Sequence, residues 1–313
     1  MSNKYSQGPP SGRSLTLLAT MMLMGMLVAF AAMAATAAAT PKGEFAVFAQ
    51  CPLSNANVEA CTVAKSEKGK FIIGAKEVPI EKAITLQGGL GEANPCEPPF
   101  TQKGACRRPF YGAANGETLS KAAQNVPGGL LGLVNCKTIE NALLRAACEF
   151  FFEHGITQVT ATTELAGTPE VSEAALFEPI LSEAFGIPAI TLPIKIKLDN
   201  GLLGSSCYIG SAAEPIRLNL ITGTTKPPAP NKPITGSVGT EESNEAGNII
   251  TIRNNKLVDN SFAAPGTNGC GTFGLLDPIL NASIGVPSKA GTNTAVLEGK
   301  LQQAGAEAVK AHE

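Results

Sequence analysis

The sequence predicts a β-rich α+β fold, an antiparallel sandwich or open barrel that carries two or three short helices and is stapled by disulfides. In the second half of the chain, apolar and polar residues alternate with period two in several segments, which is typical of sheets with one solvated face. Helical patterns are confined to a few short segments, and eight cysteines all follow an apolar leader. These three observations favour an exported domain dominated by sheets.

The leader is the most apolar part of the chain. Residues 15–34 are strongly apolar, Lys4 and Arg13 precede them, and a series of small residues follows. Positive charge ahead of an apolar segment keeps that end in the cytoplasm, and the small-x-small pattern predicts cleavage of a secretory signal after Ala37 or Ala39. Because a bilayer crossing needs about 20 apolar residues, an uncut membrane anchor through 15–34 is the alternative.

The chain therefore divides into a signal peptide, 1–39, and a secreted or cell-surface domain, 40–313. The chain has 24 Lys and Arg and 26 Asp and Glu, a net charge of −2. Loss of Lys4 and Arg13 with the leader changes the net charge to −4. A mildly acidic domain has no electrostatic footprint for nucleic acid. The expected partners are the export machinery and a cell-envelope component.

The eight cysteines predict four disulfides, since oxidised pairs are the usual state outside the cytoplasm. Many connectivities are formally possible, and proximity in sequence suggests Cys51–Cys61, Cys96–Cys106, Cys136–Cys148 and Cys207–Cys270. Metal binding is the weaker alternative, because the chain has no C-x-x-C motif and only two histidines, His154 and His312. We therefore expect neither a metal nor another cofactor.

One of these pairs conflicts with a predicted helix. Residues 137–155 have apolar side chains at helical spacing and end at Gly155. A straight helix would hold Cys136 and Cys148 about 18 Å apart at 1.5 Å per residue, whereas a disulfide needs Cα atoms within about 7 Å. We keep the pair and predict that the helix breaks near Asn141.

The first half of the exported domain predicts strands and one insertion. Residues 43–53 have strand-like apolar content, and 61–80 predict a strand, a polar Lys/Gly turn and a second strand. Residues 91–125 are rich in Gly, Pro and Ala without a period, which indicates a loop or insertion tied by Cys96 and Cys106. We expect its 96–106 loop to lie outside the core. The glycine-broken segment 126–133 predicts a turn into the following helix.

A strand at 156–165 and a helix at 168–186 come next. The helix is expected to begin with Thr168 as N-cap and Pro169 in its first turn. Pro179 should divide it, because proline cannot donate the hydrogen bond that continues a helix.

The strongest strand signals are 190–198 and 215–223, where apolar residues alternate with Lys, Arg or Asn. A proline-rich connector at 224–236 should be extended and partly rigid. Residues 248–258 predict a hairpin with Asn254-Asn255 at its turn.

The last elements are weaker. Asp277 as N-cap and Pro278 in the first turn predict a short helix within 274–285. Residues 295–299 predict a last strand, and the Ala- and Gln-rich end predicts a frayed helix.

The residues needed for catalysis are poorly supplied. A nucleophile needs an adjacent base, but the chain has two histidines and no G-x-S-x-G motif, and His154 is better explained as the complement of a helix dipole. Paired carboxylates could hydrolyse a glycoside without histidine, and the candidates are Asp199, Asp259, Asp277 and Glu164. Turn and cap chemistry explains Asp199 and Asp277 better, and the absence of Trp lowers the expectation of sugar binding.

Three binding motifs have simpler explanations. Asp259 and Asn260 could ligate calcium, but the spaced acidic ligands of a calcium loop are missing, so a loop fixed by Cys270 is favoured. Asn281 begins a formal glycosylation acceptor, which would mean little if the chain were bacterial, and it falls in a predicted helix. The prolines at 227–233 are better explained as a spacer than as a ligand of a polyproline-binding module.

Four strings together resemble a group of exported actinobacterial proteins: "FAVFAQCP", "VPGGLLGL", "LPIKIKLDNGLLGSSCYIGS" and "FAAPGTNGCGTFGLLD…GVPSKAGTN". The resemblance covers most of the chain after the leader and is densest at 190–211 and 258–293. Among six cysteines it favours the pairs Cys51–Cys61, Cys136–Cys148 and Cys207–Cys270. Cys96 and Cys106 fall in a segment that looks specific to this chain. The resemblance implies export and no particular activity.

Two classes of function remain open. The first is a non-catalytic secreted or cell-envelope protein that binds a surface component or another copy of itself. The second is an extracellular hydrolase with a carboxylate site. The missing catalytic motifs favour the first, whereas two carboxylates facing each other in a deep cleft would favour the second.

Overall fold

The computed structural model describes residues 40–100, 102, 104–133, 136–138, 140–143, 145–146, 149 and 158–313. The described residues belong to one compact unit, 40–313. The predicted signal peptide, with its cleavage sites after Ala37 and Ala39, lies outside them. In the described part, no helix combines the length and apolar character needed to cross a membrane.

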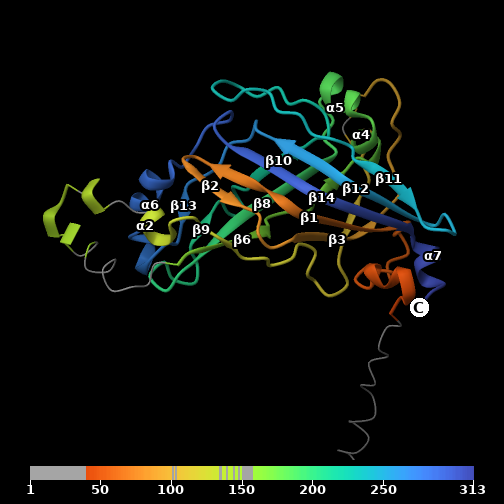
Figure 1. The fold of residues 1–313 in the computed structure, drawn as a ribbon, viewed down its shortest axis with the longest axis horizontal. Helices are drawn as coiled ribbons and strands as arrows, with labels where there is room; N and C mark the ends of the chain where they lie inside the picture. Colours follow the sequence, from red (N-terminus) through yellow and green to blue (C-terminus); the bar gives the residue numbers. More distant parts are fainter. Residues whose placement is uncertain are drawn as a thin grey trace, which may run out of the picture. The chain divides into compact units, whose positions relative to one another are not determined.

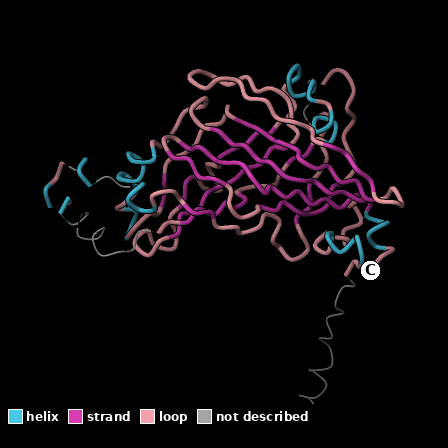
Figure 2. Tube along the Cα trace, in the orientation of Figure 1, coloured by secondary structure: helices cyan, strands magenta, loops and turns pink. Residues whose placement is uncertain are grey.

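The unit 40–313 contains two antiparallel sheets (Figures 1 and 2), which confirms the predicted β-rich sandwich. The first sheet is built from β1 (Ala60–Ile73), β2 (Lys76–Pro79), β3 (Ile84–Leu90), β4 (Phe110–Gly112), β11 (Thr240–Ser243), β12 (Ile249–Asp259) and β14 (Thr294–Gly305). Its strand order is β11-β12-β14-β1-β3-β4, with β2 paired to β1. The long β1–β14 pairing joins strands from opposite ends of the domain, and β12–β14 extends the sheet on the other side of β14.

The second sheet has β8 at its centre. Its strands are β5 (Gln124–Asn125), β6 (Thr160–Leu165), β7 (Glu170–Val171), β8 (Ile190–Asp199), β9 (Tyr208–Ile209), β10 (Ile216–Leu220) and β13 (Thr267–Asn268). The order is β13-β9-β8-β6-β5, and β7 and β10 also pair with β8. Along β8 the buried Ile194, Ile196 and Leu198 alternate with the partly exposed Lys195 and Lys197, as the period-two pattern predicted.

Five short α-helices lie in the described part, together with three 3₁₀ turns. They are η1 (Gly43–Phe48), α2 (Gly129–Leu133), η2 (Cys136–Thr138), α4 (Glu173–Phe177), α5 (Pro179–Phe185), η3 (Thr272–Gly274), α6 (Asp277–Ile284) and α7 (Ala306–Lys310). Figure 1 shows α2 and α6 at one end of the sandwich and η1 and α7 at the other. We call these the α2–α6 end and the terminal end.

The turn predicted in the centre of 61–80 is wrong. β1 continues through Lys68 and Gly69, with a bulge between Ser66 and Lys68, and the chain reverses only at Gly74. β3 and β14 pair with the two edges of β1. Their hydrogen bonds keep the polar centre extended although its local composition favours a turn.

The hairpin predicted at Asn254-Asn255 is also wrong. β12 is one strand, and its register against β14 skips Asn254, which has φ +56°. Asparagine tolerates this left-handed conformation, so the same residue chemistry serves a bulge as well as a turn. Gly299 of β14 pairs with Asn255, next to the bulge. On its other side, β14 lies so close to β1 that a Cβ on Gly299 would be 1.8 Å from the Lys65 carbonyl oxygen.

The two ends of the domain differ from the predictions as well. Residues 43–53 begin with the 3₁₀ turn η1 rather than a strand, and η1 buries Phe45 and Phe48. The last strand is far longer than 295–299, because β14 runs from Thr294 to Gly305, and only α7 remains of the predicted frayed helix.

The helix predicted from Thr168 begins later. Residues Glu170–Val171 pair with β8 as β7, and Ser172 is the N-cap of α4, accepting a hydrogen bond from Ala175 N at 3.2 Å. The division at Pro179 is confirmed, because α5 starts there. Pairing with β8 outweighs the local preference of the Thr-Pro-Glu start for a helix.

Three of the four predicted disulfides are confirmed: Cys51–Cys61, Cys96–Cys106 and Cys207–Cys270. The fourth prediction involves Cys148, and most of the helix predicted at 137–155 falls with it outside the described residues. Within the described part, Glu140 and Asn141 are not helical and separate η2 from the helical Ala142 and Leu143. This interruption lies where the helix break was predicted.

The 96–106 loop is not outside the core, contrary to our expectation. Cys106 is only 3% exposed and belongs to a buried cluster with Ala175, Leu181 and Ile187. Further along, Phe110 and Leu119 join the main core. Arg108 also binds Glu173 on α4 at 2.6 Å. A segment without an apolar period can still contribute single buried side chains once a disulfide and an ion pair fix its course.

Candidate functional site

The four candidate carboxylates lie on different elements, and those of Glu164, Asp259 and Asp277 have structural roles. Asp199 is exposed at the end of β8, followed by a turn in which Asn200 Oδ1 accepts from Leu202 N at 2.9 Å. Glu164 on β6 forms an ion pair at 3.3 Å with Lys195 of β8, whose ammonium lies 4.2 Å from the Tyr208 ring centroid. Cross-strand pairs of this kind stabilise a solvated sheet face.

Asp277 is not the N-cap that its position predicted. Leu276 occupies that position, and the Asp277 carboxylate accepts from Gly269 N at 3.0 Å and from Cys270 N at 3.1 Å. The carboxylate therefore fixes the turn that carries the Cys207–Cys270 disulfide.

Asp259 is the most buried of the four, at 3% exposed. Its oxygens accept from Asn219 N at 2.7 Å and from Ser261 N at 2.8 Å. Burial raises the pKa of the Asp259 carboxyl, and these two hydrogen bonds oppose the rise. Because both oxygens serve the backbone, the carboxylate joins the end of β12 to β10.

The predicted alternative of calcium binding at Asp259 and Asn260 gains no support. Asn260 Nδ2 donates to Lys232 O at 2.8 Å, while its buried Oδ1 has no hydrogen-bond partner among the described residues. One such oxygen beside an occupied carboxylate falls short of the six or more that calcium takes. The described residues contain no cluster of three or more His, Cys, Asp or Glu side chains suited to a metal.

The histidines, Asn281 and the proline-rich connector were the other candidates from the sequence. Those within the described residues have structural roles. His312 stacks on Phe45 with ring centroids 4.0 Å apart at the terminal end, whereas His154 is outside the described residues. Asn281 lies inside α6, as predicted, and its Oδ1 accepts from Thr267 N at 2.7 Å. The extended course predicted for the connector 224–236 is wrong, because the segment folds back on itself with a bridge between Thr224 and Thr235 and a hydrogen bond from Thr225 N to Ile234 O at 2.9 Å.

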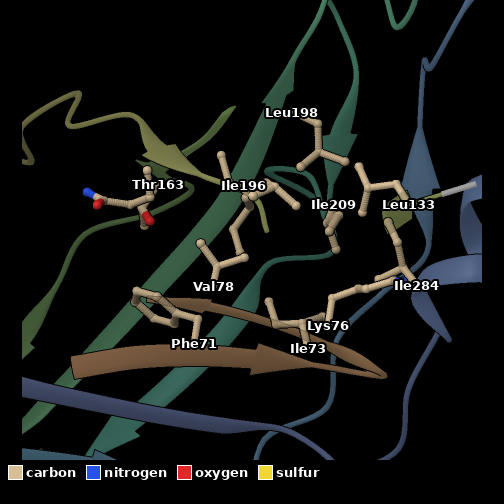
Figure 3. Close-up of a pocket in the computed structure, with 13 residues that line it drawn as sticks. Phe71, Ile73, Lys76, Val78, Leu133, Thr163, Ile196, Leu198, Ile209 and Ile284 are labelled. Carbon is tan, nitrogen blue, oxygen red and sulfur yellow. The ribbon is translucent and has the colours of Figure 1, made fainter. Parts of the chain in front are cut away.

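An apolar cavity of about 40 Å³ lies between the sheets near the α2–α6 end (Figure 3). Phe71, Ile73 and Val78 approach it from the first sheet, and Ile196, Leu198 and Ile209 from the second. Leu133 of α2 and Ile284 of α6 close its end. The volume is well below the roughly 300–1,000 Å³ of sites for drug-sized ligands, so in this conformation it admits only a small apolar group.

Three polar side chains border this cavity, those of Lys76, Gln124 and Thr163, and the backbone holds the first two. Lys76 Nζ donates to Gly132 O and so ties β2 to α2. Gln124 accepts from Glu81 N and Lys82 N at 2.8 and 2.9 Å and donates to Lys82 O at 2.7 Å. The polar atoms of Lys76 and Gln124 are used in the protein, so the lining of the cavity is apolar except at Thr163.

Sequence reasoning missed this cavity, since its lining residues come from eight strands and helices and from one segment between them. No sequence period marks them as neighbours. The one available signal was the uncharged segment 126–133, which places apolar residues among glycines at the α2–α6 end.

Comparison of the chain with protein-family models, with curated proteins and with solved structures found no significant match to any of them. The function must therefore be inferred from the chemistry of the fold itself.

Proposed function

We propose that this chain is an exported, non-catalytic binding protein of the cell envelope or the secreted fraction, and that it belongs with the actinobacterial group it resembles. Three disulfides are typical of a protein that folds outside the cytoplasm. The carboxylates of Glu164, Asp259 and Asp277 stabilise strands and turns on separate elements, and this supports binding over carboxylate-based hydrolysis.

The observation that carries the binding proposal is the cavity between the sheets. Apolar residues of both sheets and of two helices converge on it, whereas a fully packed core leaves few voids larger than a water molecule. Its chemistry fits the end of one alkyl chain, entering where α2 and α6 close the sandwich. An apolar cavity of this kind binds an apolar group because filling it restores lost dispersion contacts.

The test uses octanoate and methyl resonances of the cavity. Octanoate should shift the δ1-methyl signals of Ile73, Ile209 and Ile284 in a saturable titration monitored by NMR. Ala161→Ile, which fills the cavity from β6, should abolish these shifts. Ala75→Ile adds the same side chain at an exposed turn and should leave them unchanged.

Stability measurements separate a binding site from a packing defect. If the extra methyl groups fit, Ala161→Val should raise the melting temperature and still weaken the octanoate-induced shifts. Octanoate-induced shifts that persist in both cavity-filling variants would contradict the proposal, as would their absence in the unmodified protein.

A further inference from the structure

A second feature of the α2–α6 end is the tip loop, residues 271–276, which precedes α6. Phe273 is 97% exposed and Leu275 is 72% exposed. Phe273 has φ +56° and ψ +26°, a left-handed conformation that is rare for a bulky residue. Glycine would adopt it without penalty. Because strained backbone conformations cluster at functional sites, a strained and fully exposed phenylalanine points to a role outside the fold.

The tip loop is held at its base. Cys270 is bonded to Cys207, its amide nitrogen donates to Asp277, and its carbonyl accepts from Leu276 N at 3.0 Å. These bonds fix the turn and present the Phe273 side chain outward. The apolar side chains are therefore preorganised for an external contact, and little conformational entropy is lost when one forms.

The surrounding sequence is almost free of charge. Between Asn260 and Ser288 the only ionisable side chain is Asp277, and both of its oxygens accept backbone hydrogen bonds. An approaching apolar phase therefore has no free charge of this segment to desolvate.

We propose that the tip loop inserts Phe273 and Leu275 into the surface of a lipid bilayer. A second copy of the chain fits less well, because a stable protein interface needs about 800 Å² per partner, whereas one aromatic side chain buries roughly 150–250 Å². A bilayer interface needs no complementary shape and accepts aromatic side chains at the headgroup level. This contact is independent of whether the cavity takes a ligand.

The chain contains no tryptophan, so Phe273→Trp in the exported protein provides one fluorophore at the tip. Phosphatidylcholine vesicles should move its emission to shorter wavelength, and brominated phosphatidylcholine should quench it. Added salt should not reverse either effect, because the contact is apolar. The matched control is Phe185→Trp, at a half-exposed phenylalanine on α5 that contacts Phe100; its emission should not change.

The double substitution F273S/L275S should lower the vesicle partition coefficient by at least about tenfold, since both inserted side chains are lost, with an unchanged melting temperature. Three results would overturn the proposal. The first is a Phe273→Trp emission that does not change when vesicles are added. The second is an equal change in the emission of Phe185→Trp. The third is a blue shift of Phe273→Trp that appears without lipid and depends on protein concentration. The last would assign the tip to contact between copies.

Discussion

The two ends of the sandwich differ in the burial of their apolar side chains. At the terminal end, Phe45 and Phe48 of η1 are buried in a separate cluster with Cys51, Cys61 and Val309 of α7, and His312 covers Phe45. At the α2–α6 end, a cavity remains inside and Phe273 and Leu275 stand in solvent. Both ends are closed by short helices and a disulfide, so the difference lies in where the apolar side chains point.

This contrast shows that the exposure of Phe273 and Leu275 at the α2–α6 end is a local feature of the tip loop. The same chain buries its phenylalanines where a partner surface is available, and singly exposed apolar residues are common in proteins. What is unusual is the combination of exposure, a left-handed backbone and a clamped base at Phe273. The predictions below test the two ends against each other, from the largest expected effect to the smallest.

Loss of the disulfide at the α2–α6 end should have the largest effect. Cys207 and Cys270 are 63 residues apart in sequence, against 10 for Cys51 and Cys61. In the chain-entropy model the longer loop contributes about 4 kcal/mol and the shorter about 3 kcal/mol. Replacing both cysteines by alanine should therefore lower the denaturant midpoint more at 207/270 than at 51/61. The reverse order would show that the terminal end limits the stability.

The Cys96–Cys106 pair gives the next largest effect. The sequence-based view of the 96–106 loop as an insertion outside the core predicts almost no change when this disulfide is removed. Because Cys106 packs against Ala175 and Leu181, we expect the double alanine variant to lose about 2–3 kcal/mol of unfolding free energy. Denaturant melts at fixed pH measure the loss, and an unchanged midpoint would restore the insertion view.

Asp259→Asn should cost about 1–3 kcal/mol, because one of two backbone N–H donors, those of Asn219 and Ser261, loses its acceptor. The raised pKa of Asp259 means that the folded protein binds a proton more readily than the unfolded chain. The unmodified protein is therefore stabilised at this carboxyl as pH falls through its folded-state pKa. The difference in unfolding free energy between the two proteins should widen on acidification, and a narrowing would contradict the direction of the shift.

Phe273→Gly should have the smallest effect on stability, within about 0.5 kcal/mol of zero. Relief of the left-handed strain is offset by the greater backbone freedom of glycine in the unfolded chain. A thermal melt gives the result. A loss above about 1 kcal/mol would be diagnostic of a lost structural contact and would mean that Phe273 stabilises the fold.

Residue types and their spacing were enough to predict the sandwich, the strands β8 and β10, the division at Pro179 and three disulfides. The strands follow from period-two burial, and the division at Pro179 follows from proline geometry. Two disulfides join cysteines close in sequence, and the third joins the two remaining cysteines of the second half, Cys207 and Cys270. The candidate carboxylates could be named, but not placed. Asp277 looked like a cap until the fold placed the amides of Gly269 and Cys270 beside it.

Pairing between distant strands could be decided only by the tertiary structure. Asn254-Asn255 and the Lys/Gly centre of β1 favour turns locally, yet both stay within single, bulged strands because β14 pairs with the residues on either side of each bulge. The cavity and the exposed tip depend on the same level of organisation. The sequence by itself determined which residues are apolar; the packing of two sheets and two helices decided which of them would be buried, which would border an unfilled space and which would reach solvent.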